Sequence, residues 1–95
     1  MSMKNPAHPG GLIRDNIDDL GLSVAQAAAG LGVTRQQLHR VINGTSAVTP
    51  DMALRFEQAF GGSAETWLRM QTNYDLAQAR LRGVAPVKRF EPKVA

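Results

Sequence analysis

The stretch from Ser23 to Asn43 constrains the fold of this chain more than any other. Ser23 is followed three residues later by Gln26, and Thr34 is followed three residues later by Gln37. Each pair has the pattern of a capping box at the start of a helix. A Leu-Gly-Val segment lies between them, and its glycine can take a positive φ without strain. The residues therefore predict two short helices joined by a tight turn.

Two such helices make a helix-turn-helix, whose second helix lies in the major groove of DNA. Arg35, Gln36 and Arg40 are the predicted base readers on that helix. Arginine can bond both major-groove acceptors of guanine, and glutamine can bond adenine at N6 and N7. Contacts to phosphates, which set register rather than sequence preference, are predicted for Thr34, Gln37, Asn43 and Ser46.

The charge distribution supports this prediction better than the total does. The net charge is +3, but residues 80–95 hold five basic residues against one acidic, and residues 1–79 hold six against seven. No acidic residue occurs from Gly21 to Pro50. Carboxylates there would weaken binding to a phosphate backbone, so the absence of acidic residues from this segment favours a surface for double-stranded DNA.

The rest of the chain predicts an all-α domain of five helices. We expect residues 1–8 to form an N-terminal arm, residues 9–82 the helix-turn-helix domain, and residues 83–95 a flexible basic tail. Pro9 suits the first position of the first helix. Leu12, Ile13, Ile17 and Leu20 form its apolar stripe. The fourth helix has a stripe of its own, made by Met52, Ala53, Phe56, Ala59 and Phe60.

The spacing of Trp67, Tyr74 and Leu81 adds a prediction about assembly. They are seven residues apart, which is typical of a helix face that packs against another helix. We expect Trp67 and Leu68 to lie in the core, and Tyr74 and Leu81 to face a partner subunit. The C-terminal helix would then hold a homodimer, and a dimer can bind two half-sites about 34–36 Å apart.

Other function classes find little support. There is no cysteine, and His8 and His39 are far apart in sequence, so we expect no metal site and no cofactor. His39 lacks the partner that a catalytic base needs, so an enzyme is not expected. Asp15, Asp18 and Asp19 lack the spacing of a calcium loop and are interpreted as a solvated helix face. No apolar run has the length of a membrane span or of a signal peptide core, so the expected compartment is the cytoplasm.

Several stretches carry a family resemblance. They are His8-Pro-Gly-Gly-Leu-Ile-Arg14, the segment Leu31–Gly44, the segment Val48–Arg55, Ser63-Ala-Glu-Thr-Trp-Leu-Arg-Met-Gln71 and Asn73-Tyr-Asp-Leu76. With these segments the chain resembles the HigA-type antitoxins, within the phage-repressor-like (XRE) helix-turn-helix group. The His-Pro-Gly opening and the Trp-Leu-x-x-Gln segment are more specific to HigA than the helix-turn-helix itself.

The resemblance implies a five-helix fold and a homodimer that represses its own operon. It also implies a toxin partner, a RelE-like endoribonuclease that cleaves mRNA on the ribosome. By position, Arg35, Gln36 and Arg40 match the family's major-groove readers. Many members have glutamine just after the first cap of the motif, where it braces a reader and a phosphate. Here that place is Val24, which removes one implied phosphate contact.

Two alternatives remain open from the sequence. The first is a stand-alone repressor of the phage type with no toxin partner. The second is a protein-interaction module in which the helix-turn-helix no longer reads DNA. The acidic face with Asp15, Asp18 and Asp19 has the charge to attract a basic partner.

Overall fold

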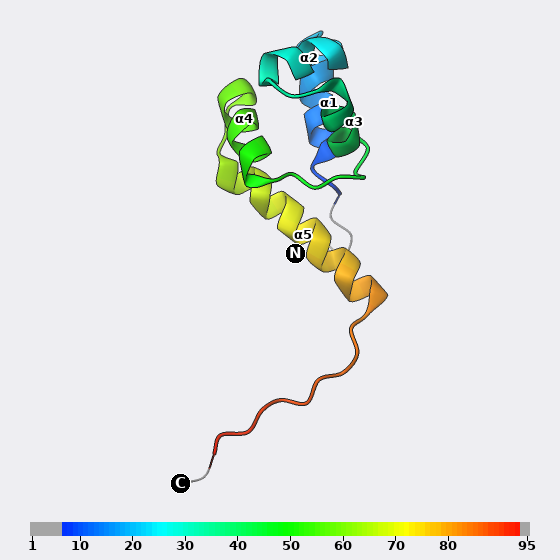
Figure 1. Ribbon diagram of the computed structural model, residues 1–95, viewed down its shortest axis with the longest axis vertical. Helices are drawn as coiled ribbons and strands as arrows, with labels where there is room; N and C mark the ends of the chain where they lie inside the picture. Colours follow the sequence, from blue (N-terminus) through cyan, green and yellow to red (C-terminus); the bar gives the residue numbers. More distant parts are fainter. Residues whose placement is uncertain (1–6, 94–95) are drawn as a thin grey trace.

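A computed structural model describes residues 7–93, and over this range the chain forms five α-helices and no strand, as predicted. They are α1 (Gly10–Asp19), α2 (Val24–Leu31), α3 (Arg35–Ile42), α4 (Pro50–Phe60) and α5 (Ala64–Arg82). The first four form a compact head, and α5 packs against α4 and then runs out beyond the head (Figure 1). This projecting helix and the segment after it make the molecule elongated, 63 × 28 × 26 Å.

The helix starts follow the predicted local signals. The Ser23 hydroxyl accepts a hydrogen bond from the Gln26 N–H at 3.1 Å, and Gln26 Oε1 accepts one from the Ser23 N–H at 2.8 Å. The same reciprocal pair joins Thr34 and Gln37, at 3.0 and 2.9 Å. Helices of eight residues are too short to be stable alone. These caps help them by satisfying backbone donors that have no partner within the helix. Side-chain caps also form at Thr49 and Ser63.

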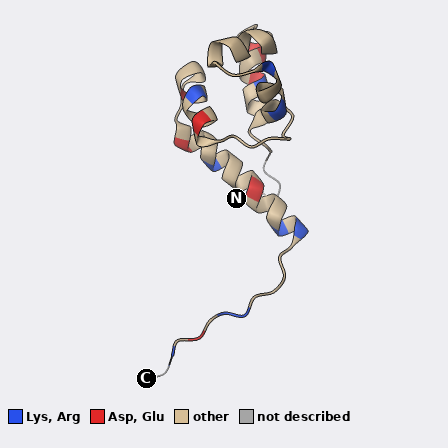
Figure 2. Cartoon of the chain, in the orientation of Figure 1, with Lys and Arg blue, Asp and Glu red and all other residues tan. Residues whose placement is uncertain are grey.

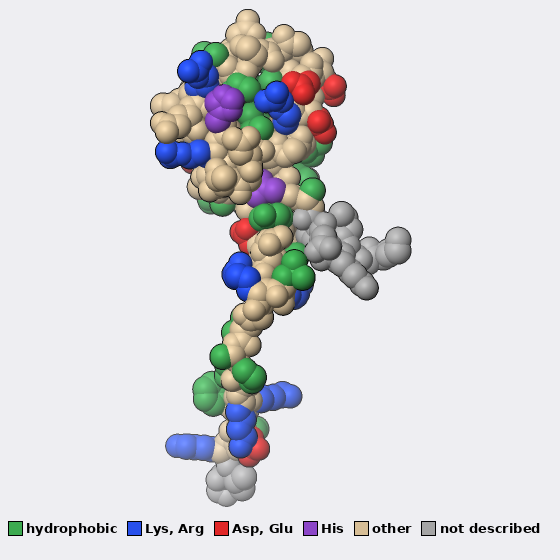
Figure 3. Space-filling model, turned by 90° about the vertical axis from the view of Figure 1, so that its right-hand side faces the viewer, with side chains coloured by type: hydrophobic (Ala, Val, Ile, Leu, Met, Phe, Trp, Pro, Cys, Tyr) green, Lys and Arg blue, Asp and Glu red, His purple; other side chains and the backbone are tan. Residues whose placement is uncertain are grey.

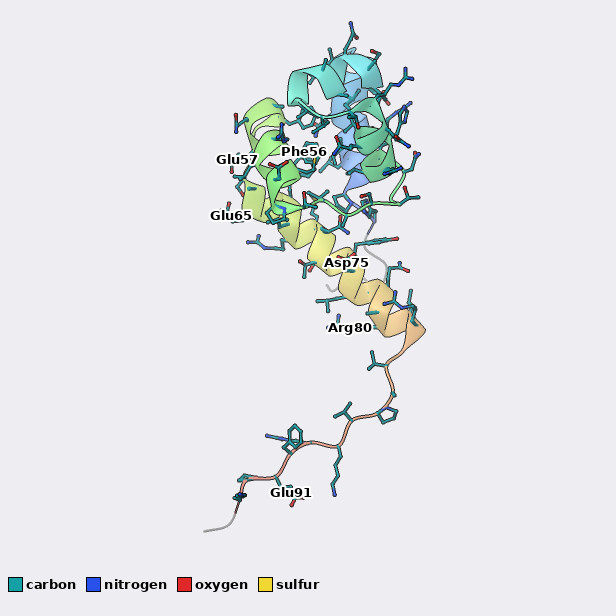
Figure 4. All side chains as sticks on the ribbon, in the orientation of Figure 1. Phe56, Glu57, Glu65, Asp75, Arg80 and Glu91 are labelled. Atoms are coloured by element: carbon teal, nitrogen blue, oxygen red, sulfur yellow. The ribbon has the colours of Figure 1, made fainter. Side chains whose placement is uncertain are left out.

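The core lies where α4 and α5 meet the helix-turn-helix. Phe56, which points inward from α4, is 0% exposed (Figure 4). Its ring centroid is 5.3 Å from that of Trp67 and 5.8 Å from that of Phe60. The other buried apolar side chains come from all five helices and the loop before α4: Ile13, Ile17, Ala27, Ala28, Leu31, Leu38, Val41, Val48, Met52, Ala53, Ala64 and Ala77. The predicted core position of Trp67 is confirmed, and Leu68 packs at the edge of the same cluster.

The predicted first helix needs two corrections. Pro9 is its N-cap rather than its first helical residue, although it is fully buried. Only Ile13 and Ile17 of the predicted stripe face the core, whereas Leu12 is 45% and Leu20 59% exposed. Leu12 lies about 100° around the helix from Ile13, and Leu20 is the C-cap residue beyond the end of α1. Ala59 of the fourth helix is likewise exposed.

The N-terminus of α1 approaches the C-terminus of α3 at Gly10. A Cβ atom at this position would lie 2.1 Å from the Val41 carbonyl oxygen and 2.7 Å from that of Ile42. These distances are far below van der Waals contact, so only glycine permits the approach. Gly11, the next residue of the same helix, has open space where a Cβ would stand.

A buried glutamine ties the loop before α4 to α5. Gln71 is only 5% exposed, and its Oε1 accepts a hydrogen bond from the Val48 N–H at 2.8 Å. Its Nε2 donates to Asp75 Oδ1 at 2.9 Å. Among the described residues, no buried side-chain nitrogen or oxygen is left without a partner.

Replacing Gln71 with methionine should destabilise the fold. The substitution keeps the volume but leaves the buried Val48 N–H without an acceptor, which costs about 1–3 kcal/mol. The measurement is the free energy of unfolding in urea. Gln58→Met on the exposed face of α4 is the matched control and should change it by less than about 0.5 kcal/mol. Equal effects of the two substitutions would contradict this role for Gln71.

Beyond α5 the chain has no regular structure. Gly83 ends the helix with a φ of 79°, and residues 83–93 are exposed throughout. The predicted tail was drawn to residue 95, and its last two residues lie outside the described range. So do residues 1–6 of the predicted arm. No helix in the described part of the chain is long and apolar enough to cross a membrane.

Candidate nucleic-acid interface

Helix α3 presents one polar face to solvent. Leu38 and Val41 anchor it in the core, which turns the opposite side outward. That side carries the three predicted base readers Arg35, Gln36 and Arg40, all exposed. The structure therefore brings the three readers together on one accessible helix face.

Two further exposed residues share this face. Asn43 caps the C-terminus of α3 and lies seven residues after Gln36, on the same side of the helix. His39 stands one turn after Arg35 and is also exposed. The same helical spacing places it beside the predicted readers. The outward face thus offers five polar side chains rather than three.

The residues predicted to contact phosphates lie at three places along α3. Thr34 and Gln37 are joined by the capping box at the start of α3. Ser46 lies beyond its other end, where its N–H donates to the Arg40 carbonyl at 3.1 Å. Asn43 stands apart from these residues, on the outward face just described. The structure hence spreads the predicted phosphate contacts along the whole length of α3.

A shallow hollow runs between α3 and the start of α4. Its volume is about 320 Å³, and it is lined by Gln37, Arg40, Ser46 and Thr49, with Asp51 and Arg55 at its α4 side. Backbone and side-chain donors on a helix N-terminus and an arginine are groups that bind phosphate oxygens. The hollow thus brings Arg40 and Arg55 together with polar side chains beside the exposed face of α3, and Asp51 adds one carboxylate on its α4 side.

Charge is segregated over the head. Helices α2 and α3 carry no acidic residue, and basic segments mark α3 (Figure 2). Figure 3 shows basic side chains and a histidine on the visible face of the head, with carboxylates gathered along one edge. The acidic side chains of α1 come from Asp15, Asp18 and Asp19, and Arg14 pairs with Asp18 at 3.5 Å. A polyanion would meet the α3 face without like-charge repulsion from this edge.

The His8 side chain connects three segments of the chain next to this surface. Nδ1 of His8 accepts a hydrogen bond from the Gly10 N–H at 2.9 Å, at the start of α1. The ring stands edge-on to Tyr74 of α5, with 4.9 Å between centroids. Burial lowers the pKa of His8 below its usual 6.5, against the opposing charge of Asp75 and a hydrogen bond with the Ser46 backbone. His8 therefore connects α1, the loop that carries Ser46, and α5 in its neutral form.

This connection predicts a pH dependence of stability. Because the folded-state pKa of His8 is lowered, protonation favours the unfolded chain. The contribution of neutral His8 to the free energy of unfolding is complete above pH 6.5 and is lost as the pH falls below that value. The free energy of unfolding, measured by urea denaturation from pH 7.5 to 5.0, should fall more steeply for the wild type than for His8→Gln. Parallel curves would show that His8 does not carry the dependence.

The two predicted dimerisation residues occupy different surroundings. Tyr74 is partly buried against His8 of its own chain, whereas Leu81 is 67% exposed near the end of α5. Leu76, on the same projecting part of the helix, is also exposed. The described structure thus leaves Leu76 and Leu81 exposed on the outer part of α5, about 140° apart around the helix.

The helix-turn-helix family matches residues 13–67, more than half of the chain. The chain belongs to the helix-turn-helix family. Virulence-associated protein A' of Dichelobacter nodosus is 46% identical over 77 residues, which cover 80% of this chain and 67% of that protein.

Solved structures place this helix-turn-helix protein beside antitoxins. Antitoxin HigA of Pseudomonas aeruginosa, solved with the higBA promoter, has a TM-score of 0.78 and 30% identity, covering 82% of this chain and 86% of that one. An addiction module antidote protein of the HigA family from Coxiella burnetii has the same TM-score and coverage at 32% identity. The resemblance to HigA-type antitoxins is confirmed.

One departure from the family pattern also has a structural explanation. Val24 is the first residue of α2, and it packs partly buried against the core. An apolar side chain held there cannot donate to a phosphate.

Proposed function

We propose that this protein is the antitoxin of a type II toxin-antitoxin module. It binds operator DNA through α3, represses its own operon and neutralises a RelE-like, mRNA-cleaving toxin. The proposal is carried by one observation: an acid-free, exposed α3 face lies in a fold that matches HigA of P. aeruginosa, an antitoxin solved with its promoter. Arg35, Gln36 and Arg40 read bases in this proposal. Thr34, Gln37, Asn43 and Ser46 hold the backbone.

The proposed DNA-binding unit is a homodimer. A single recognition helix has limited affinity, and two copies can bind half-sites about 34–36 Å apart. Leu81 supports this assembly because it is exposed on the side of α5 that also carries Tyr74, seven residues earlier. Sedimentation of the wild type against Leu81→Glu tests it, since a buried carboxylate should shift the dimer toward monomer. An unchanged dimer in the variant would exclude this part of α5 from the interface.

Co-expression tests the antitoxin role. The protein is produced with the product of the neighbouring reading frame, and the two are purified through a tag on the neighbour. We expect a stable complex and relief of growth arrest when both proteins are present. A specific operator-binding protein that neither captures nor neutralises its neighbour would instead be a stand-alone repressor. Affinity for DNA that is only non-specific, roughly 10⁻⁴–10⁻⁶ M at physiological salt, would support the interaction-module alternative.

A further inference from the structure

Arg55 of α4 closes the turn of the helix-turn-helix. Its Nη1 donates to the Leu31 carbonyl oxygen at 2.8 Å and to that of Gly32 at 3.3 Å. Its Nε donates to Asp51 Oδ2 at 2.8 Å, one helical turn earlier on α4. One guanidinium thus joins α4 to the end of α2, across more than twenty residues of sequence.

The chemistry of the turn favours an arginine. The last carbonyls of a helix have no partner within it, and they form the negative end of its dipole. A guanidinium carries several donors in a fixed fork, so Asp51 can hold one side while the other meets the carbonyls. Gly32 is required because its φ is 73°, and a Cβ there would also lie 2.9 Å from Arg55 Nη1, so that the guanidinium would have to shift.

Helix α3 begins three residues after Gly32, at Arg35. The position of the turn relative to α4 consequently determines where the first turn of α3 lies. We propose that Arg55 is a positioning residue for DNA reading: through the turn carbonyls it fixes where Arg35 and Gln36 meet the bases. The inference rests on the proposed DNA-binding function and adds a residue outside the recognition helix to it.

A direct phosphate contact is the competing role, because Arg55 also lines the hollow beside Arg40. The two roles differ in salt dependence. Losing a phosphate contact lowers the slope of log K against log salt by about 0.9 and weakens all sequences alike. Losing a positioning contact lowers the ratio of affinities for specific and scrambled DNA, and it leaves the slope of log K against log salt unchanged. Arg55 Nε is already bonded to Asp51, and Nη1 to the turn carbonyls, which favours the positioning role over a direct phosphate contact.

The experiment compares Arg55→Met and Arg55→Lys with the wild type. Arg69→Met and Arg69→Lys on the exposed face of α5 are matched controls. Fluorescence anisotropy measures binding to a duplex from upstream of the gene and to a scrambled duplex of equal composition, over a range of salt. Temperatures well below the midpoint of unfolding are used, so that lost stability alone does not change the affinity. Hydrogen exchange is followed at the Gly32 and Val33 amides, which close the turn onto Ala29 and Ala28.

We expect both Arg55 variants to lose about tenfold in discrimination, roughly the value of one base contact, with an unchanged salt slope. Exchange at Gly32 and Val33 should become faster, while the Leu22 amide before α2 should not change. The Arg69 variants should resemble the wild type. A lower slope with discrimination retained, or unchanged exchange at the turn, overturns the proposal. If the wild type itself does not discriminate, the proposed function fails, and exchange still decides whether Arg55 holds the turn.

Discussion

Replacing Arg35 and Arg40 together with alanine should lower affinity for the operator duplex at least about 30-fold, since each good base contact contributes roughly 1–3 kcal/mol of discrimination. Both side chains are exposed on α3 and neither is needed for the core. The fold should therefore survive the double substitution. Anisotropy titrations with the upstream and scrambled duplexes provide the measurement, and circular dichroism reports the helix content.

The control removes two positive charges elsewhere. Arg14→Ala with Arg69→Ala changes the net charge by the same amount, but these residues lie on α1 and α5. We expect a small loss that is similar for both duplexes, because general electrostatic attraction does not depend on sequence. Equal losses in the two double variants would show that Arg35 and Arg40 contribute charge rather than base reading. Operator affinity retained within threefold would show that the readers lie elsewhere.

Gly10→Ala is expected to cause the largest loss of stability of any single methyl addition in the described chain. The new Cβ would meet two backbone carbonyls of α3, which cannot rotate away as a side chain can. The helices must separate, at a cost of about 3 kcal/mol. Thermal and urea denaturation measure the loss, and DNA binding should weaken with it, because Gly10 sets the distance between α1 and the end of α3.

The neighbouring glycine provides the control. Gly11→Ala places the same methyl group on the same helix, into open space. It should stabilise the protein by about 0.5 kcal/mol, because alanine loses less conformational entropy than glycine on folding. Opposite signs for adjacent identical substitutions would establish the close approach of α1 and α3. A loss at both positions would point instead to a general effect on the helix start.

Features encoded within a few residues could be predicted from the sequence. The capping boxes at Ser23 and Thr34 need only a partner three positions away, and both form. The turn at Gly32 follows from one glycine between apolar residues, and its φ is positive. The all-α class and the exposed face of α3 depend on these local rules and on simple periodicity, so the sequence alone predicts them.

Contacts between distant segments could not be predicted in this way. Gln71 is a polar residue on an exposed-looking helix, and only the approach of the loop at Val48 explains its burial. His8 was assigned to a surface arm but is held by α1 and α5. The apolar stripe of α1 was drawn too wide, since periodicity shows which residues share a side and not how much of that side is covered. Leu12 stays exposed for this reason, whereas Leu20 is exposed because α1 ends before it.

The capping box at the start of α3 makes two adjacent glutamines chemically unequal. Gln37 Oε1 already accepts from the Thr34 N–H, which holds the amide in the capping geometry and leaves chiefly its two N–H donors for a ligand. Adenine needs a donor and an acceptor from the same amide, and phosphate needs only donors. Gln36, whose amide has no such commitment among the described contacts, keeps both. Exchanging Gln36 for glutamate would thus alter which base is accepted, whereas the same exchange at Gln37 would repel the DNA backbone whatever its sequence.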